Sequence, residues 1–121
     1  LFLYDLKQMD PVIHREQTGA DNQPILSNLN RLVQEAGVIL RVPLIPGFNA
    51  TSDDVLAIVR YGISLGLRQI HLLPYHHYGE NKYKFLGRSY PWKGQRELTQ
   101  EEQDMLRHVA QKEGIQVCIG G

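Results

Sequence analysis

Short apolar runs alternate along this chain with stretches of helical spacing. Residues 1–4 are consecutive apolar or aromatic side chains, so residues 1–5 predict a buried strand of the kind found in parallel sheets covered on both faces. Residues 38–45, 69–75 and 115–119 predict three further strands, and Pro46-Gly47 ends the second with a strong turn signal. The polar stretch 8–23 carries no predicted element.

Three helices are predicted between these strands, because apolar residues recur there at spacings of three and four. The first begins near Pro24 and ends before Gly37, and the second ends at Gly66. The predicted inward-facing residues of the three helices are, in turn, Ile25, Leu26, Leu29, Leu32, Val33 and Ala36; Val55, Ile58, Val59, Gly62 and Ile63; and Met105, Leu106, Val109 and Ala110.

The starts of the second and third helices carry side chains suited to capping. Thr51 and Asp54 resemble a capping box in which Asp replaces the usual Glu, although Ser52 or Asp53 could be the cap instead. Thr99 and Glu102 form the standard pair. These two motifs predict helix starts near residues 51 and 99.

The order of predicted elements is β-α-β-α-β-α-β, with a long loop before the last helix. Such alternation predicts an α/β fold with parallel strands and right-handed crossovers. Part of a (β/α) barrel and a small open doubly wound sheet both fit this order. No Gly-x-Gly-x-x-Gly or Walker-type loop follows a strand, which argues against a Rossmann or P-loop nucleotide site.

Composition limits the possible classes further. The 121 residues suffice for a single domain, 1–121, and the formal net charge of zero gives no global field toward nucleic acid or an anionic membrane. No apolar run approaches the roughly 20 residues of a membrane-spanning helix. Cys118 is the single cysteine, which excludes an intrachain disulfide and a cysteine-cluster metal site built from this sequence alone, and fits a cytoplasmic location.

Polar residues stand at the predicted ends of the first two strands, where α/β folds bind ligands. Asp5 and Lys7 are expected on one side of the first strand, where an ammonium, carboxylate or ribose hydroxyl could be held. An isolated Asp-x-Lys, however, is more typical of a structural ion pair. Arg41 lies in an apolar run and must be paired or reach the mouth of the strand, so a salt bridge and a carboxylate-binding role are both open.

The third strand brings histidines and a long loop. The spacing of His71, His76 and His77 matches no zinc pair, so no metal site is predicted, and a strand-end histidine is better suited to hydrogen bonding with a ligand. Basic and aromatic residues are interleaved in loop 79–97. That mixture is found on nucleic-acid or peptide surfaces, but also in solvated loops whose aromatic rings pack on the protein.

Three blocks of sequence together resemble a known family. They are Tyr4-Asp5-Leu6-Lys7-Gln8-Met9, Leu40-Arg41 followed by Ile45-Pro46-Gly47-Phe48, and Leu72-Leu73-Pro74-Tyr75-His76. In order and approximate spacing they resemble the C-terminal half of glycyl-radical-enzyme activating enzymes, the pyruvate formate-lyase activating enzyme group of the radical S-adenosylmethionine superfamily. The resemblance covers essentially the whole chain.

This resemblance implies a partial (β/α) barrel and a cofactor site. It implies that Asp5, Leu6 and Lys7 line an S-adenosylmethionine site, that His76 contacts the same ligand, and that Arg41 approaches its methionine part. The implied chemistry is reductive cleavage of S-adenosylmethionine by a 4Fe-4S cluster, giving a 5′-deoxyadenosyl radical that takes hydrogen from a glycine. The implied partners are a glycyl radical enzyme resembling pyruvate formate-lyase and an electron donor such as flavodoxin.

The chain departs from the family in lacking the Cys-x-x-x-Cys-x-x-Cys motif that holds the cluster. We therefore expect it to be the C-terminal part of a longer enzyme, inactive alone, that self-associates through the exposed edge of strand 1–5. A non-catalytic α/β binding module that holds a protein partner with loop 79–97 is the alternative. A barrel enzyme with Lys7 as a Schiff-base amine is a third possibility.

Overall fold

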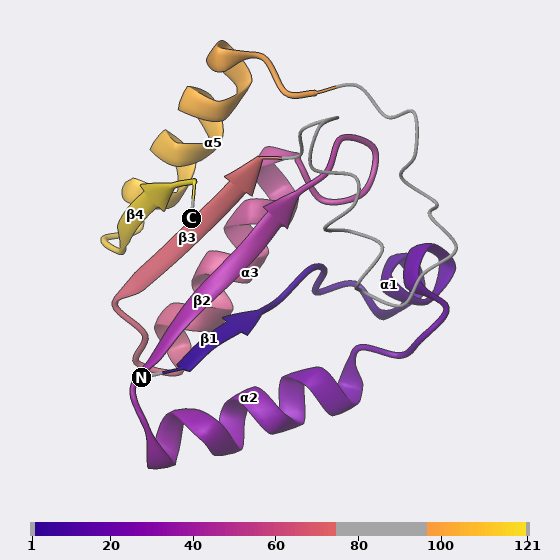
Figure 1. Ribbon diagram of the computed structural model, residues 1–121, viewed down its shortest axis with the longest axis vertical. Helices are drawn as coiled ribbons and strands as arrows, with labels where there is room; N and C mark the ends of the chain where they lie inside the picture. Colours follow the sequence, from indigo (N-terminus) through magenta and orange to yellow (C-terminus); the bar gives the residue numbers. More distant parts are fainter. Residues whose placement is uncertain (1, 75–96, 121) are drawn as a thin grey trace.

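A computed structural model describes residues 2–74 and 97–120. Its centre is a four-stranded parallel sheet in the order β1-β2-β3-β4 (Figure 1). The strands are β1 (Phe2–Asp5), β2 (Val38–Leu44), β3 (Gln69–Pro74) and β4 (Gln116–Ile119), and the helices are α1 (Pro11–Thr18), α2 (Gln23–Glu35), α3 (Ser52–Ser64) and α5 (Gln100–Gln111). The predicted α/β fold with a parallel sheet is confirmed.

The strand order separates the two architectures left open by the sequence. Each crossover moves one position in the same direction, whereas a doubly wound sheet reverses direction at a switch point. Helix α3 lies against the sheet and packs beside α5, which also contacts β4 (Figure 1). The sequential order is that of a section of a (β/α) barrel.

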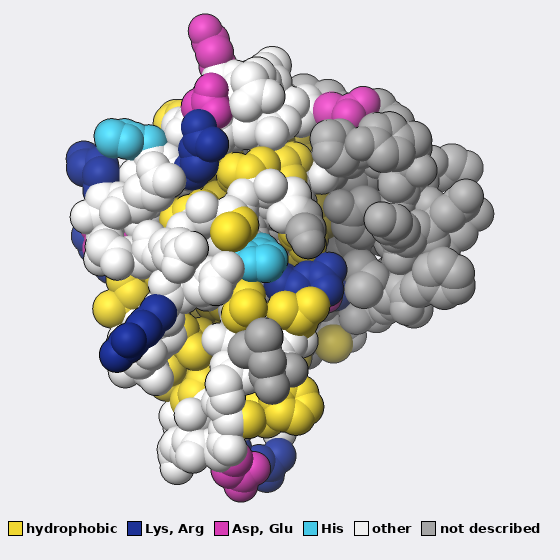
Figure 2. Space-filling view, turned by 60° about the vertical axis from the view of Figure 1, so that its left-hand side comes forward, with side chains coloured by type: hydrophobic (Ala, Val, Ile, Leu, Met, Phe, Trp, Pro, Cys, Tyr) yellow, Lys and Arg dark blue, Asp and Glu magenta, His cyan; other side chains and the backbone are white. Residues whose placement is uncertain are grey.

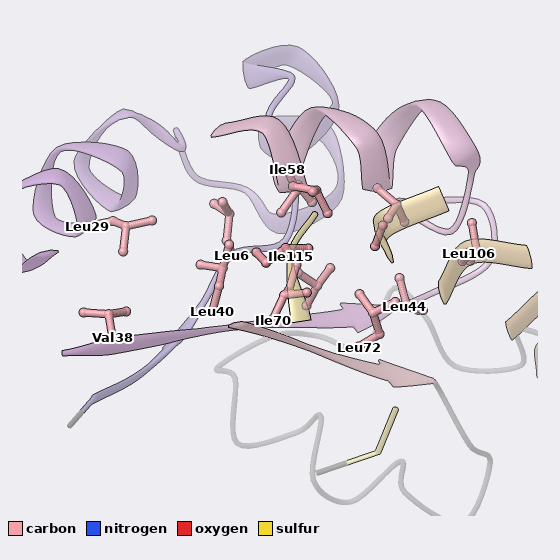
Figure 3. Packing of buried hydrophobic residues seen from close by; sticks show 14 of the residues in the cluster. Leu6, Leu29, Val38, Leu40, Leu44, Ile58, Ile70, Leu72, Leu106 and Ile115 are labelled. Carbon is pink, nitrogen blue, oxygen red and sulfur yellow. The ribbon is translucent and has the colours of Figure 1, made fainter. Parts of the chain in front are cut away.

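Alternate residues of the central strands form the core. Leu40, Val42 and Leu44 of β2 are fully buried, as are Ile70 and Leu72 of β3. Figure 3 shows Leu40, Leu44, Ile70 and Leu72 on the side of the sheet that faces the helices, in one cluster with helical residues such as Leu29 and Ile58. The residues between them on each strand point to the opposite face of the sheet, which carries the polar groups of the candidate site.

The first strand differs from its prediction. Phe2 is 51% exposed and Leu3 is 55% exposed, so β1 is not covered on both faces. The reason is position, because β1 is at the edge of the sheet and pairs only with β2 within the described residues. An apolar run predicted the strand correctly but did not predict how much of it is exposed.

Both predicted helix starts are confirmed. The Thr51 hydroxyl accepts a hydrogen bond from the Asp54 backbone N–H at 3.1 Å. The Thr99 hydroxyl accepts from the Glu102 N–H at 3.1 Å, and the Glu102 carboxylate accepts from the Thr99 N–H at 2.9 Å, which completes the capping box. Local side-chain chemistry therefore sets where α3 and α5 begin.

Helix α1 was missed, because its buried face is polar. Asp10 caps its first turn, Pro11 is its first residue, and Gly19 follows it in the left-handed conformation. The inward side chains are His14 and Thr18, which contact each other at 3.1 Å. A search for apolar periodicity cannot find such a helix.

Two predicted inward residues are exposed. Ile63 of α3 is 38% exposed and Met105 of α5 is 47% exposed. Ile63 follows the buried Gly62, and Met105 precedes the buried Leu106. Adjacent helical residues are about 100° apart around the helix axis, so Ile63 and Met105 lie beside the buried face and not on it. The buried stripe on each helix is thus narrower than the sequence suggested. In the described part of the chain, no helix has both the length and the apolar character that crossing a membrane requires.

Candidate functional site

The candidate site lies where the carboxyl end of β1 meets the middle of β2. Asp5 is the last residue of β1 and is in register with Arg41 of β2, which is in register with His71 of β3. The backbone continues the pairing for one residue beyond β1, because the Leu6 N–H donates to the Arg41 carbonyl at 2.9 Å. Parallel pairing therefore brings together acidic and basic residues that are 36 positions apart in the sequence.

Asp5 and Arg41 form an ion pair, but the Arg41 Nε does not donate a hydrogen bond to the Asp5 carboxylate. The Arg41 Nε lies 3.5 Å from the Asp5 Oδ1, and the two side chains are 35% and 42% exposed. The same Nε is buried and has no hydrogen-bond partner among the described residues. The contact between the two side chains is therefore electrostatic, because hydrogen-bond strength falls steeply with poor geometry. The guanidinium thus keeps an unused N–H donor.

The structure separates the roles of Leu6 and Lys7. The Leu6 side chain is 1% exposed and belongs to the hydrophobic core, so only its backbone can meet a ligand. The Lys7 side chain is partly buried, and its backbone carbonyl accepts a hydrogen bond from Asn49 Nδ2 at 2.8 Å. The strand-end segment thus carries one apolar side chain anchored in the core and one partly buried lysine.

Three buried amide side chains hold this segment, and sequence analysis did not identify them. Gln8, Asn22 and Asn49 are each at most 2% exposed, and we call them the amide clamp. Gln8 Nε2 donates to the Phe48 carbonyl at 2.8 Å, and Asn22 Nδ2 donates to the Met9 carbonyl at 2.9 Å. Asn and Gln next to turn residues are common in loops, so only the structure shows that these amides are buried and shared between distant segments.

Tyr4 fixes the other side of β1. Its hydroxyl donates to the Ile25 carbonyl of α2 at 2.7 Å, and the Tyr61 hydroxyl of α3 donates to the Leu26 carbonyl at 3.4 Å. Burial raises the pKa of the Tyr4 phenol, and the neighbouring Tyr61 raises that pKa further. Tyr4 therefore remains a neutral hydrogen-bond donor at neutral pH.

A row of polar residues crosses the sheet on the face opposite the core. Asp5, Arg41, His71 and Cys118 are successive register partners on β1 to β4. Gln69 Nε2 lies 3.1 Å from His71 Nε2 and 3.6 Å from Cys118 Sγ. Figure 2 shows a histidine and a basic side chain next to each other, surrounded by hydrophobic side chains. Such a row suits a ligand with both charged and apolar parts.

The remaining predicted site residue, His76, lies outside the described residues, as do His77 and residues 79–96 of the basic aromatic loop. Within residues 2–74 and 97–120, no group of three His, Cys, Asp or Glu side chains is arranged to hold a metal ion. The described residues therefore offer an ion pair with a spare donor and an amine, a set suited to a carboxylate or to hydroxyl groups.

Three known proteins that are similar to this chain are all named as activating enzymes. The chain is 39% identical over 120 residues to the pyruvate formate-lyase 2-activating enzyme of Escherichia coli K12, covering 98% of this chain and 41% of that protein. It is 38% identical over 124 residues to the choline trimethylamine-lyase activating enzyme of Oleidesulfovibrio alaskensis, covering 98% and 40%. It is 34% identical over 119 residues to the 4-hydroxyphenylacetate decarboxylase activating enzyme of Clostridioides difficile, covering 96% and 38%. No family model matches.

A solved structure has the same fold. The crystal structure of a domain of pyruvate-formate lyase-activating enzyme from Bacteroides vulgatus superposes with a TM-score of 0.77 at 27% sequence identity, covering 98% of this chain and 66% of that one. The predicted partial barrel is thus supported by both the strand order and this similarity. The chain spans about two fifths of the length of the curated relatives described above.

Proposed function

Because this chain belongs to the family of glycyl-radical-enzyme activating enzymes, we propose that it supplies the part of such an enzyme that holds S-adenosylmethionine. The observation that carries the proposal is the Asp5–Arg41 pair, in which the arginine side chain is 35% exposed and its Nε has no hydrogen-bond acceptor among the described residues. Because Nε itself is shielded from solvent, a ligand carboxylate would bind the other N–H groups of the guanidinium.

In this proposal, each residue of the chain has a defined part. Arg41 binds the carboxylate of the ligand, Asp5 accepts hydrogen bonds from its amine or ribose hydroxyl groups, and the Lys7 amine adds a positive charge at the strand end. Leu6 contributes its backbone, since its side chain is in the core. His76 is proposed as a further ligand contact from the segment that follows β3.

The residues present fit S-adenosylmethionine but not the iron–sulfur cluster. When bound, S-adenosylmethionine supplies the radical that takes hydrogen from a glycine of a partner enzyme, after reductive cleavage by a 4Fe-4S cluster. The cluster needs thiolates from outside this sequence, because Cys118 is its single cysteine and lies half-buried on β4. We expect this chain alone to be inactive. A 4Fe-4S absorbance after reconstitution of this chain with iron and sulfide would contradict that.

The proposed partners follow from the same family. They are a glycyl radical enzyme resembling pyruvate formate-lyase and an electron donor such as flavodoxin, in the cytoplasm. For residues 1–121 by themselves we also propose self-association through β1, whose Phe2 and Leu3 are more than half exposed at a sheet edge. Light scattering at increasing concentration tests this, and a monomer at all concentrations would contradict it.

The direct test is ligand binding. Titration of the ¹⁵N-labelled chain with S-adenosylmethionine at millimolar concentrations should shift backbone amide signals around Asp5, Lys7 and Arg41. Weak binding is expected, because the cluster that contributes to binding this ligand is absent. Lys7→Ala and His76→Ala should reduce the shifts. Unchanged spectra in the wild-type chain at saturating ligand would contradict the proposal.

A further inference from the structure

Asn49 uses its whole amide to join the ends of two strands. Its Nδ2 donates to the Lys7 carbonyl at 2.8 Å and to the Pro43 carbonyl at 2.6 Å, and its Oδ1 accepts from the Ile45 N–H at 2.8 Å. The side chain has no solvent exposure. Both donor hydrogens and one acceptor site are thus satisfied inside the protein, where removing a partner is costly.

A second amide makes the connection reciprocal. Asn49 reaches back from the turn after β2 to Lys7, while Gln8 reaches from the segment after β1 to the Phe48 carbonyl at 2.8 Å. Gln8 also accepts from the Met9 N–H at 3.0 Å. Two segments about forty positions apart therefore hold each other through buried side chains, whereas strand ends commonly continue into surface loops.

The consequence concerns the relative placement of the charged groups. Register pairing fixes Asp5 next to Arg41, but β1 ends there, so pairing alone does not fix Lys7. The backbone of Lys7 is instead tied to the turn after β2, the same strand that carries Arg41. The backbone positions of Asp5, Arg41 and Lys7 are thus all fixed relative to β2 and the turn that follows it.

We propose that Asn49 is a positioning residue for the ligand site, which sets where the Lys7 amine lies relative to the Asp5–Arg41 pair. This inference rests on the proposed function, since it assigns a role within the same site. Asn49 acts through Lys7 and does not itself contact the ligand. Its effect on binding should exceed what its contribution to stability explains.

Asn22 provides a matched control within the amide clamp. It is nearly as buried as Asn49, at 2% exposure against 0%, and it also donates two hydrogen bonds to backbone carbonyls, those of Gln8 at 3.1 Å and Met9 at 2.9 Å. It holds the same segment from the side of α2 without bonding to Lys7 or Pro43. Asn49→Ala and Asn22→Ala thus remove similar interactions but only the first removes the link to β2.

The first measurement needs no ligand. We expect amide hydrogen exchange at Leu6, whose N–H donates to the Arg41 carbonyl, to increase about tenfold in Asn49→Ala and to stay near the wild-type rate in Asn22→Ala. Amide exchange in the central strand β3 reports global unfolding, so faster exchange at Leu6 with unchanged exchange in β3 means a local effect. Unchanged exchange at Leu6 in Asn49→Ala would overturn the proposal. If Asn49→Ala does not fold, Asn49→Ser, which keeps one hydroxyl donor, takes its place.

The second measurement is the amide-shift titration with S-adenosylmethionine. Asn49→Ala should weaken binding about tenfold, Asn22→Ala should weaken it far less, and Asn49→Ser should recover part of the loss. Equal weakening in Asn49→Ala and Asn22→Ala would mean a general structural role and overturn the proposal. If the wild-type chain does not bind the ligand, the proposed function fails, and exchange at Leu6 alone then decides whether Asn49 positions the strand end.

Discussion

Asp5 and Arg41 lie side by side on neighbouring parallel strands, with Arg41 Nε 3.5 Å from Asp5 Oδ1 and without a hydrogen bond between those atoms. The pair is more than one third exposed on both sides, so solvent screens it and its contribution to stability is small. A strong structural ion pair would have a short, well-aligned hydrogen bond. This geometry is compatible with the proposed role of the arginine in binding an anion.

Arg41→Lys should therefore affect binding more than folding. Lysine keeps the charge but loses the planar fork that can grip a carboxylate through two hydrogen bonds. We expect the free energy of unfolding to change by less than about 1 kcal/mol and the affinity for S-adenosylmethionine to fall about tenfold. Urea unfolding and the amide-shift titration measure the two quantities.

Arg15 offers the control for this prediction. It also pairs with an aspartate, Asp21, at 3.2 Å, with side chains that are 66% and 44% exposed, but it is on α1 and not in the sheet. Arg15→Lys should leave both stability and affinity nearly unchanged. Equal losses of affinity in Arg15→Lys and Arg41→Lys would count against a role for Arg41 in binding.

Tyr4 should make the fold sensitive to alkaline pH. Its pKa is raised above the ordinary value of 10.0 by burial and by Tyr61, so the folded chain holds the phenolic proton more tightly than the unfolded chain does. The resulting stability is present in full below about pH 10 and is lost as the pH rises through the folded pKa. The urea midpoint should therefore stay steady on this account below about pH 10 and fall as the pH rises above it.

Tyr4→Phe isolates this effect from the titration of lysines and other tyrosines. It removes the hydrogen bond to the Ile25 carbonyl and should cost about 1 kcal/mol at neutral pH. It should also lose less stability than the wild-type chain over the same alkaline range. An equal alkaline loss in both proteins would show that Tyr4 is not responsible.

The predictability of the fold depended on whether each element bears a local signal. Helices α3 and α5 were predicted with their starts, because in both a threonine hydroxyl accepts a hydrogen bond from the backbone three positions on, and in α5 a glutamate completes the capping box. Helix α1 was missed, because its buried His14 and Thr18 are polar and leave no apolar period. Its capping signal, Asp10-Pro11, was present but was not sufficient without such a period.

The candidate site was only partly predictable for a similar reason. Asp5 and Arg41 were both identified as candidates, but their pairing depends on the register, which places the end of β1 beside the middle of β2. The burial of the Leu6 side chain and the three amides of the clamp could not be expected. The Asn49 bond to the Lys7 carbonyl spans 42 positions, and no spacing rule connects residues at that distance.

The capping box of α5 predicts a measurable coupling. Thr99→Ala removes the acceptor for the Glu102 N–H and should cost about 1 kcal/mol of unfolding free energy. Glu102→Ala should cost a similar amount, and the double variant should cost less than the sum, because each residue bonds to the backbone of the other. Glu101→Gln, in the same turn, is the control. Strict additivity of Thr99→Ala and Glu102→Ala in urea unfolding would contradict the reciprocal arrangement.

Two adjacent residues of α5 test how sharply the core ends. Leu106 has no exposed surface, whereas Met105 is 47% exposed and contacts the Ser52 hydroxyl at 3.9 Å. Leu106→Ala should cost about 2–5 kcal/mol because it leaves a cavity, which is a large part of the stability of a small domain. Met105→Ala should cost less than about 1 kcal/mol. Urea unfolding at neutral pH measures both, and comparable losses would mean that the inward face of α5 includes Met105, as its sequence pattern first indicated.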